Sequence, residues 1–251
     1  MSGRKRRIVA AFSAAAATYN DHAEAQIRAA GLLLERLPPL PMAARVLELG
    51  CGTGLLTQRL LELLGPDAEL LATDLSPAMI AQARSAMADS RLCFAVVDAE
   101  APALPDSAFD LIVSSLAAQW FANLPATLDR LVGLLKPGGR LLLTTLGADT
   151  FAEWRAAHAA TGRTAGIAAY PKAAELQAMI VGATVESAPF AIAYADARAF
   201  LKGLEAIGAA TPRPGHRPLP AGALRRIMAG LGAPCSITWD ILILGVTKES
   251  Q

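Results

Sequence analysis

Three glycines stand close together in the stretch VLELGCGTG, at Gly50, Gly52 and Gly54. Glycine lets the backbone adopt conformations that other residues avoid and approach a ligand closely, so the cluster indicates a binding loop. A nucleoside-triphosphate loop needs a Lys-Ser or Lys-Thr pair after its last glycine, whereas Leu55 and Leu56 follow here. The dinucleotide fingerprint of an oxidoreductase needs a third spaced glycine or alanine where this chain has Leu55, so that interpretation is weakened but stays open.

Three acidic residues lie where successive strands are expected to end. Glu48 precedes the glycine loop, Asp74 follows the run AELLAT, and Asp98 ends the run LCFAVVD. A carboxylate at the end of the second strand of such a sheet accepts hydrogen bonds from ribose hydroxyls. Two further carboxylates would repel a pyrophosphate and suit a cationic ligand. The acids therefore favour a site for a nucleoside that carries no phosphate.

Short apolar runs that alternate with helical segments position these residues. We expect strands at 45–49, 68–73, 92–98, 109–115 and 140–146. Such a series is typical of a parallel sheet covered by helices on both faces, with ligands at the carboxyl ends of its strands. After Thr150 we expect helices at 150–161, 172–180, 196–207 and 221–231, a strand at 184–193 and a last strand at 236–247.

The composition narrows the class of protein. A hydrophobic fraction of 53% with 18% charged residues indicates a folded chain, and a net charge of +1 gives no argument for nucleic-acid binding. Cys51, Cys93 and Cys235 are far apart in no metal-ligand spacing, which indicates reduced thiols in a cytosolic protein. The basic run Arg4–Arg7 precedes no clean cleavage context, and no apolar run reaches membrane-spanning length. We expect a cytoplasmic protein without metal, nucleic acid or membrane.

Four stretches, VLELGCGTG, ATDLSPAMI, VVDAEAPALPDSAFDLIVSS and LLKPGGRLLLTT, resemble in order the motifs of class I methyltransferases that use S-adenosyl-L-methionine. The resemblance implies a Rossmann-like, doubly wound α/β fold: a mostly parallel seven-stranded sheet with N-terminal helices and a C-terminal helical insertion or lid. It implies one domain over 1–251, made of an N-terminal helical cap (1–40), a cofactor-binding core (45–146), substrate-side helices and insertion (150–235) and a last strand (236–247).

The same resemblance assigns cofactor roles to individual residues. Asp74 would hold the ribose hydroxyls, Asp98 with the backbone at Ala99 would hold the adenine amino group, and Glu48 would orient the methionine end. Tyr19 lies in an N-terminal segment that can fold over the cofactor. The full set implied for S-adenosyl-L-methionine is Glu48, Gly50, Gly52, Gly54, Asp74, Leu75, Asp98, Ala99 and Tyr19.

The flanking stretches AFSAAAATYNDHAEAQ, SSLAAQWFANLPATL and FLKGLEAIGAATPRPG resemble the malonyl-acyl-carrier-protein O-methyltransferases of biotin synthesis. The implied reaction is transfer of a methyl group to the free carboxylate of malonyl-acyl-carrier protein, which gives the methyl ester that starts biotin (pimeloyl) synthesis. The pair Gln119–Trp120 also resembles carboxyl methyltransferases for small acids such as aconitate, so a small free acid stays open as the alternative.

This chemistry needs no general base. A malonyl carboxylate is ionised near neutral pH because carboxyl pKa values lie at about 4. None of His22, His158 and His216 follows a strand of the core sheet. Placement of the reactants and exclusion of water should therefore drive the reaction. Gln119 and Trp120 follow the fourth strand, and we expect their side-chain N–H groups to position the acceptor carboxylate.

A basic bias in the last third suggests where an acidic carrier protein docks. Between Asp196 and Arg226 the chain has six Lys or Arg residues against two acids. Lys202 is our candidate for gripping the malonyl group. The substrate-binding residues predicted from this segment are Lys202, Arg198, Arg213 and Arg217.

Overall fold

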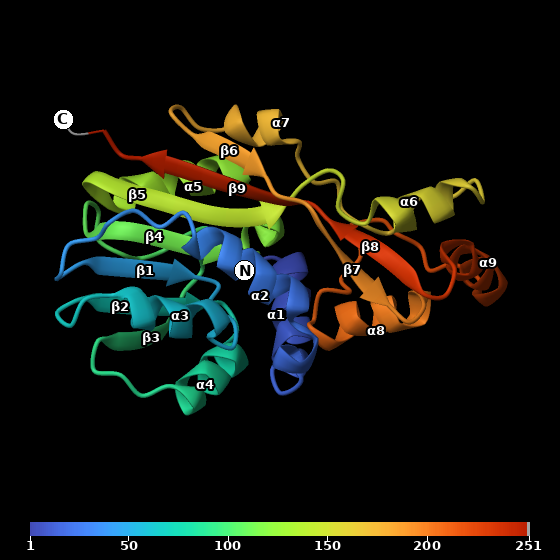
Figure 1. Ribbon diagram of the computed structural model, residues 1–251, viewed down its shortest axis with the longest axis horizontal. Helices are drawn as coiled ribbons and strands as arrows, with labels where there is room; N and C mark the ends of the chain where they lie inside the picture. The colour runs from blue at the N-terminus through green and yellow to red at the C-terminus, as the bar shows by residue number, and fades with distance from the viewer. Residues whose placement is uncertain (250–251) are drawn as a thin grey trace.

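The computed structural model describes residues 1–249 and contains a seven-stranded sheet beside a smaller two-stranded one (Figure 1). The large sheet has the strand order β3-β2-β1-β4-β5-β9-β6, in which β9 pairs antiparallel with β5 and β6 and the other pairs are parallel. This confirms the predicted Rossmann-like fold. The strands of this sheet are β1 (Arg45–Leu49), β2 (Glu69–Asp74), β3 (Leu92–Val96), β4 (Phe109–Ser115), β5 (Leu135–Leu146), β6 (Thr184–Ser187) and β9 (Ile241–Thr247).

Helices cover both faces of the sheet because its central strands are apolar on both sides. Val46 and Leu111 face one layer, with α2 and α3, while Leu47 and Ile112 face the other, with α5 and α7. Ser76 caps α4 through the backbone N–H of Met79 at 3.2 Å. The helices in and around this sheet are α1 (Gly3–Ala15), α2 (Glu24–Leu34), α3 (Leu55–Leu63), α4 (Pro77–Ala86), α5 (Leu124–Leu134) and α7 (Ala173–Gln177), with the 3-10 turns η1 (Tyr19–His22) and η2 (Ala118–Trp120).

The register of the parallel strands brings the predicted site residues to one edge. Glu48 lies opposite Ala72 of β2 and Val113 of β4, so β1, β2 and β4 end together. Figure 1 shows α1 lying at this carboxyl-end edge, between the large sheet and the smaller two-stranded one. The loops after the three strands therefore face α1.

A cap lies beyond that edge (Figure 1). It consists of α6 (Ala152–Ala159), α8 (Ala197–Ala206), α9 (Ala221–Leu231) and a two-stranded antiparallel sheet of β7 (Phe190–Tyr194) and β8 (Cys235–Trp239). Its core packs Phe200 edge-on against Phe151, with ring centroids 5.2 Å apart. The predicted C-terminal insertion is thus a mixture of helices and strands. Within residues 1–249, no helix has the length and apolarity needed to cross a bilayer.

Two predicted strands were wrong in extent, because each divides between the two sheets. The strand expected at 184–193 breaks into β6 and β7 around Pro189, and the one expected at 236–247 breaks into β8 and β9 at Asp240. Proline has no N–H to give a strand neighbour. Asp240 is buried and accepts hydrogen bonds from the Ser187 hydroxyl at 2.8 Å and from the Asp149 N–H at 3.2 Å. The apolar alternation continues across both breaks, so it did not reveal them.

Candidate active site

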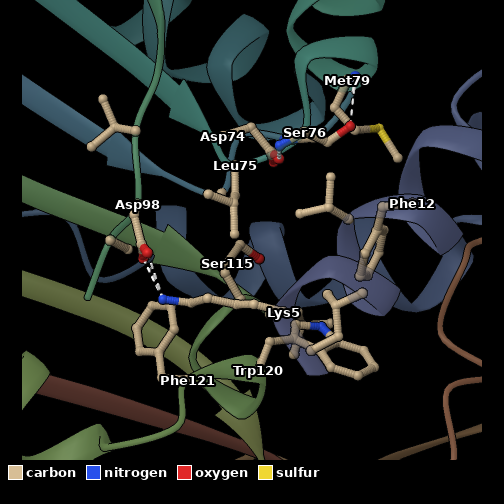
Figure 2. Close-up of a pocket in the computed structure, with 18 of the residues that line it drawn as sticks. Lys5, Phe12, Asp74, Leu75, Ser76, Met79, Asp98, Ser115, Trp120 and Phe121 are labelled. Atoms are coloured by element: carbon tan, nitrogen blue, oxygen red, sulfur yellow. Dashed lines mark hydrogen bonds and ion pairs between the residues drawn. The ribbon is translucent and has the colours of Figure 1, made fainter. Parts of the chain in front are cut away.

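A cavity lies at the carboxyl ends of β1, β2 and β4, beneath α1 (Figure 2). It encloses about 790 Å³ including its open mouth. We call it the cofactor cavity. Seven of the nine residues predicted to bind the cofactor line it: Tyr19, Gly50, Gly52, Asp74, Leu75, Asp98 and Ala99.

The glycine loop uses each of its glycines differently. Gly50, Gly52 and Gly54 have φ values of +70°, +55° and +94°, a region that favours glycine. A Cβ on Gly50 would stand 2.5 Å from that of Ala117, so this glycine permits the loops after β1 and β4 to touch. A Cβ on Gly52 would meet no atom within 4 Å, which leaves room for a ligand. Gly54 lines none of the cavities described here; it is the N-cap residue of α3, and a Cβ on it would collide with Cε of Met87, so the structure gives this glycine a packing role.

Asp74 ends β2 with its carboxylate held by the backbone. Oδ2 accepts from the Gly52 N–H at 3.0 Å, and Oδ1 accepts from the Ser76 N–H at 2.7 Å. Burial raises the pKa of Asp74, while these backbone N–H groups oppose that rise. Since each carboxylate oxygen offers two lone pairs, one on each stays available to the cavity. Asp74 can therefore accept hydrogen bonds from a pair of vicinal hydroxyls.

Glu48 lines a small adjoining cavity together with Gln26 of α2. Burial raises the pKa of Glu48 to about 8, although the Thr57 hydroxyl donates to its Oε2 at 2.7 Å. Gln26 Oε1 is buried and has no hydrogen-bond partner within residues 1–249. An orphan acceptor beside a carboxylic acid suits a ligand that brings a cationic donor, such as the amino group at the methionine end of the cofactor. The residues present therefore fit S-adenosyl-L-methionine.

The opposite end of the cofactor cavity contains a cation that the sequence did not reveal. Lys5 of α1 places its Nζ 2.6 Å from both carboxylate oxygens of Asp98 and 2.6 Å from Oε2 of Glu100. Figure 2 shows the Lys5 side chain extending across the cavity toward Asp98. The lysine offsets the charge of these two acids where a neutral adenine would lie. Asp98 still has acceptor capacity, because a carboxylate offers about four lone-pair sites.

A second, larger cavity of about 1400 Å³ including its open mouth lies between the core and the cap, and we call it the acceptor cavity. Within residues 1–249, Trp120 is the one residue that lines both this and the cofactor cavity. Its ring meets that of Phe12 edge-on, with centroids 5.5 Å apart, and its carbonyl accepts from Arg4 Nη1 at 3.0 Å. Gln119 also lines the acceptor cavity, and its Nε2 donates to the Leu116 carbonyl at 2.7 Å, which leaves one N–H of the amide free. Both residues thus line the larger cavity, after β4 and beside the cofactor cavity.

The predicted substrate residues are only partly brought together. Arg213 lines the acceptor cavity, whereas Lys202, Arg198 and Arg217 are exposed and line none of the cavities described here. The prediction that Lys202 grips the malonyl group is therefore wrong in place. It points outward from α8 because Leu201 and Leu204 occupy the face of that helix toward the cavity.

Two histidines line the acceptor cavity although they lie far from any strand end. His158 is buried on α6, with Nδ1 at 2.9 Å from the Trp154 carbonyl, and His216 follows the proline-rich loop. Neither lines the cofactor cavity, and His22 is exposed. No strand end marks either imidazole in the sequence, so only the packing of the cap onto the core reveals them.

Comparisons with known proteins agree with this geometry. Residues 47–141 match the family model described as a methyltransferase domain. The chain is 43% identical to the biotin biosynthesis bifunctional protein BioCD of Bordetella avium over 89% of its own length and 48% of that relative, so it spans about half of that protein. It is 40% identical to a malonyl-acyl-carrier-protein O-methyltransferase of Magnetococcus marinus, over 85% of this chain and 81% of the relative.

Solved structures show the same fold. The YcgJ protein of Bacillus subtilis aligns with a TM-score of 0.64 at 19% identity, over 89% of this chain and 99% of that one. The predicted class of enzyme, an S-adenosyl-L-methionine-dependent methyltransferase, is confirmed, and the oxidoreductase interpretation of the glycine loop is set aside. With this identity and coverage, the chain belongs to the family of malonyl-acyl-carrier-protein O-methyltransferases.

Proposed function

We propose that this chain transfers a methyl group from S-adenosyl-L-methionine to the free carboxylate of malonyl-acyl-carrier protein, which gives the methyl ester that starts biotin synthesis. The observation that carries the proposal is the meeting of the two cavities at Trp120. A methyl donor in the first cavity can there face a carboxylate in the second. The names of the relatives support the choice of acceptor.

The residues of the chain bind, orient and shield the reactants. When bound, the cofactor would supply a methyl group on a sulfonium: the ionised carboxylate would form the new oxygen–carbon bond in line, and the neutral thioether would leave with the electron pair of the broken carbon–sulfur bond. Asp74 fixes the ribose end, and Glu48 with Gln26 fixes the amino-acid end. Trp120 and Gln119 orient the acceptor, and α1 shields the cofactor cavity from water. No proton transfer is required, since the carboxylate is already ionised.

A methylation assay tests this proposal. We expect labelled S-adenosyl-L-methionine and malonyl-acyl-carrier protein to give a base-labile methyl ester on the carrier. Malonyl-coenzyme A and free diacids, including an aconitate-type acid, serve as competing acceptors. The proposal fails if the carrier stays unlabelled while a free diacid is methylated, because the enzyme would then be a small-acid methyltransferase.

Cofactor binding should release a proton from Glu48. At pH 6.5 this side chain is protonated in the free protein, because its pKa of about 8 lies above the pH. The α-amino group of the ligand is already protonated at this pH, since its reference pKa is about 8. The bound cation favours the carboxylate and lowers its pKa, so we expect release of up to about one proton per binding event. Titration calorimetry in buffers of different ionisation enthalpy measures this number.

Glu48→Gln is the matched variant for that experiment. The amide keeps the shape of the side chain and an acceptor for the Thr57 hydroxyl, but it cannot lose a proton. Proton release should therefore disappear in the variant. Buffer-independent binding heats in the wild-type protein would contradict the role of Glu48 at the amino-acid end.

The exposed arginines outside the acceptor cavity should contribute to docking of an acidic carrier. Arg198 of α8 and Arg217 after the proline-rich loop are both exposed. We expect the double variant Arg198→Glu/Arg217→Glu to raise the KM for malonyl-acyl-carrier protein about tenfold by charge repulsion. The kcat and the KM for malonyl-pantetheine, which has no protein to dock, should stay the same. Arg163→Glu, an exposed arginine outside this segment, controls for net charge. Equal KM values for malonyl-acyl-carrier protein in the wild-type protein and the double variant would refute docking at these two arginines.

A further inference from the structure

The acceptor cavity opens to the surface beside the proline-rich loop. The residues that line its outer part also line a surface groove between this loop and α1. Trp120 lies at the opposite, inner end, against the cofactor cavity. A substrate that presents its carboxylate at Trp120 must therefore extend toward the groove. The residues common to cavity and groove are Glu205, Ala210, Thr211, Pro212, Arg213 and His216.

Arg213 lies at the mouth of the acceptor cavity, where hydrogen bonds hold its backbone and its Nε but leave the two terminal guanidinium nitrogens available. Its backbone N–H donates to the Gly166 carbonyl at 2.8 Å, and its Nε lies 3.4 Å from the Ala165 carbonyl. Neither terminal guanidinium nitrogen has a hydrogen-bond partner among the described residues. The His216 ring packs against Gly166, where an added Cβ would come within 2.9 Å of it. The guanidinium is thus held at the opening and keeps two donor groups for a ligand.

The charges around the mouth favour an anion. Arg7 of α1 lines the groove opposite Arg213, and His216 adds a further N–H donor. Among residues 1–249, Glu205 is the one acidic residue that lines the acceptor cavity or the groove. The wall between the mouth and Trp120 is largely apolar, with Ile167, Leu201, Leu204, Leu219 and Leu224. The site therefore suits a ligand with an uncharged, partly apolar arm that ends in an anion.

An acyl group on a carrier protein is held by such an arm, a phosphopantetheine chain with a carboxylate-bearing malonyl group at one end and a phosphate at the other. We propose that Arg213, assisted by Arg7 and His216, forms a binding subsite for the phosphate of this arm. The proposal rests on the proposed function and adds the position and chemistry of the outer subsite. The guanidinium fork matches phosphate oxygens in two-point hydrogen bonding.

Two small acceptors that differ only in the phosphate test the subsite. We expect the wild-type protein to methylate malonyl-phosphopantetheine with a kcat/KM about tenfold above that for malonyl-pantetheine. The factor corresponds to one charge-assisted interaction with the phosphate, and the difference should appear in KM rather than in kcat. Arg213→Gln should bring the ratio close to one. Arg163→Gln, an exposed arginine on a neighbouring loop, should keep it. Glu205→Gln should raise the ratio by removing the one opposing charge.

The outcomes separate the two proposals. Equal kcat/KM for both thioesters in the wild-type protein would overturn the subsite and leave the proposed function standing. A tenfold ratio that survives in Arg213→Gln would overturn the assignment to Arg213. If neither thioester is methylated, nor the malonyl-carrier protein, the proposed function itself fails. Should Arg213→Gln not fold, competitive inhibition of the wild-type protein by phosphopantetheine and by pantetheine decides, because equal inhibition constants would refute the subsite.

Discussion

Asp74→Asn is expected to weaken binding of S-adenosyl-L-methionine about a hundredfold. Hydrogen bonds to a charged group contribute about 1.5–3 kcal/mol each, and a hundredfold loss corresponds to about 2.7 kcal/mol. The carboxylate already accepts from the N–H groups of Gly52 and Ser76, and Asp74 lines the cavity with acceptor capacity left on both oxygens. The asparagine amide turns one oxygen into a donor, so the two ribose hydroxyls and the two backbone N–H groups no longer all find acceptors. Titration calorimetry with the cofactor measures the change.

A weaker affinity for the cofactor could also come from local damage to the glycine loop, and two measurements distinguish this from the loss of the ribose contact. The midpoint of thermal unfolding without ligand should fall by only a few degrees in Asp74→Asn, because the neutral amide loses one of the two backbone hydrogen bonds but also removes a buried charge. Asp129→Asn, an exposed acid on α5, controls for the loss of one negative charge and should bind the cofactor normally. An unchanged dissociation constant in Asp74→Asn would mean that the ribose lies elsewhere.

Trp120→Ala is expected to lower kcat/KM for the acceptor about a hundredfold, the loss typical of a misplaced reactant. The indole ring lies between the two cavities and packs edge-on against Phe12 of α1. Without the ring the cavities merge, water gains access and the acceptor carboxylate loses its alignment with the methyl group. Steady-state kinetics with malonyl-acyl-carrier protein, together with the dissociation constant of the cofactor, measures the effect.

Trp120→Phe separates the two contributions of the indole. Phenylalanine keeps an aromatic partition against Phe12 but lacks the indole N–H, so a partial loss assigns the difference to hydrogen bonding with the acceptor. Cofactor affinity should change far less than turnover in both variants. A Trp120→Ala protein with normal kcat/KM would show that the carboxylate does not pass this ring.

The cofactor half of the site was predictable because it depends on local order along the chain. Each acid directly follows or ends an apolar run, and parallel strands carry their carboxyl ends to one edge, so Asp74 and Asp98 meet in one cavity. A nucleoside-triphosphate loop could be excluded on equally local grounds, because Leu55 and Leu56 stand where that loop needs Lys-Ser or Lys-Thr. The seven-stranded sheet follows from the same alternation of strands and helices.

The acceptor half was less predictable because it forms where distant segments pack together. His158 reaches the acceptor cavity from a helix whose placement no local pattern encodes, and the same holds for Lys5 and Gln26, which the sequence missed on the cofactor side. The error at Lys202 had an available signal, however. Leu201 and Leu204 repeat at the three-residue spacing of one helix face, which directs Lys202 away from the interior.

Arg4 and Lys5 are neighbours on α1, yet Arg4 lines the acceptor cavity and Lys5 lines the cofactor cavity. A shift of this helix therefore changes both cavities at once, and a ligand that favours one position of α1 favours it for the other ligand too. Such coupling is reciprocal: the factor by which the acceptor tightens the cofactor equals the factor by which the cofactor tightens the acceptor. The enzyme would thus bind each reactant most tightly when the other is already bound.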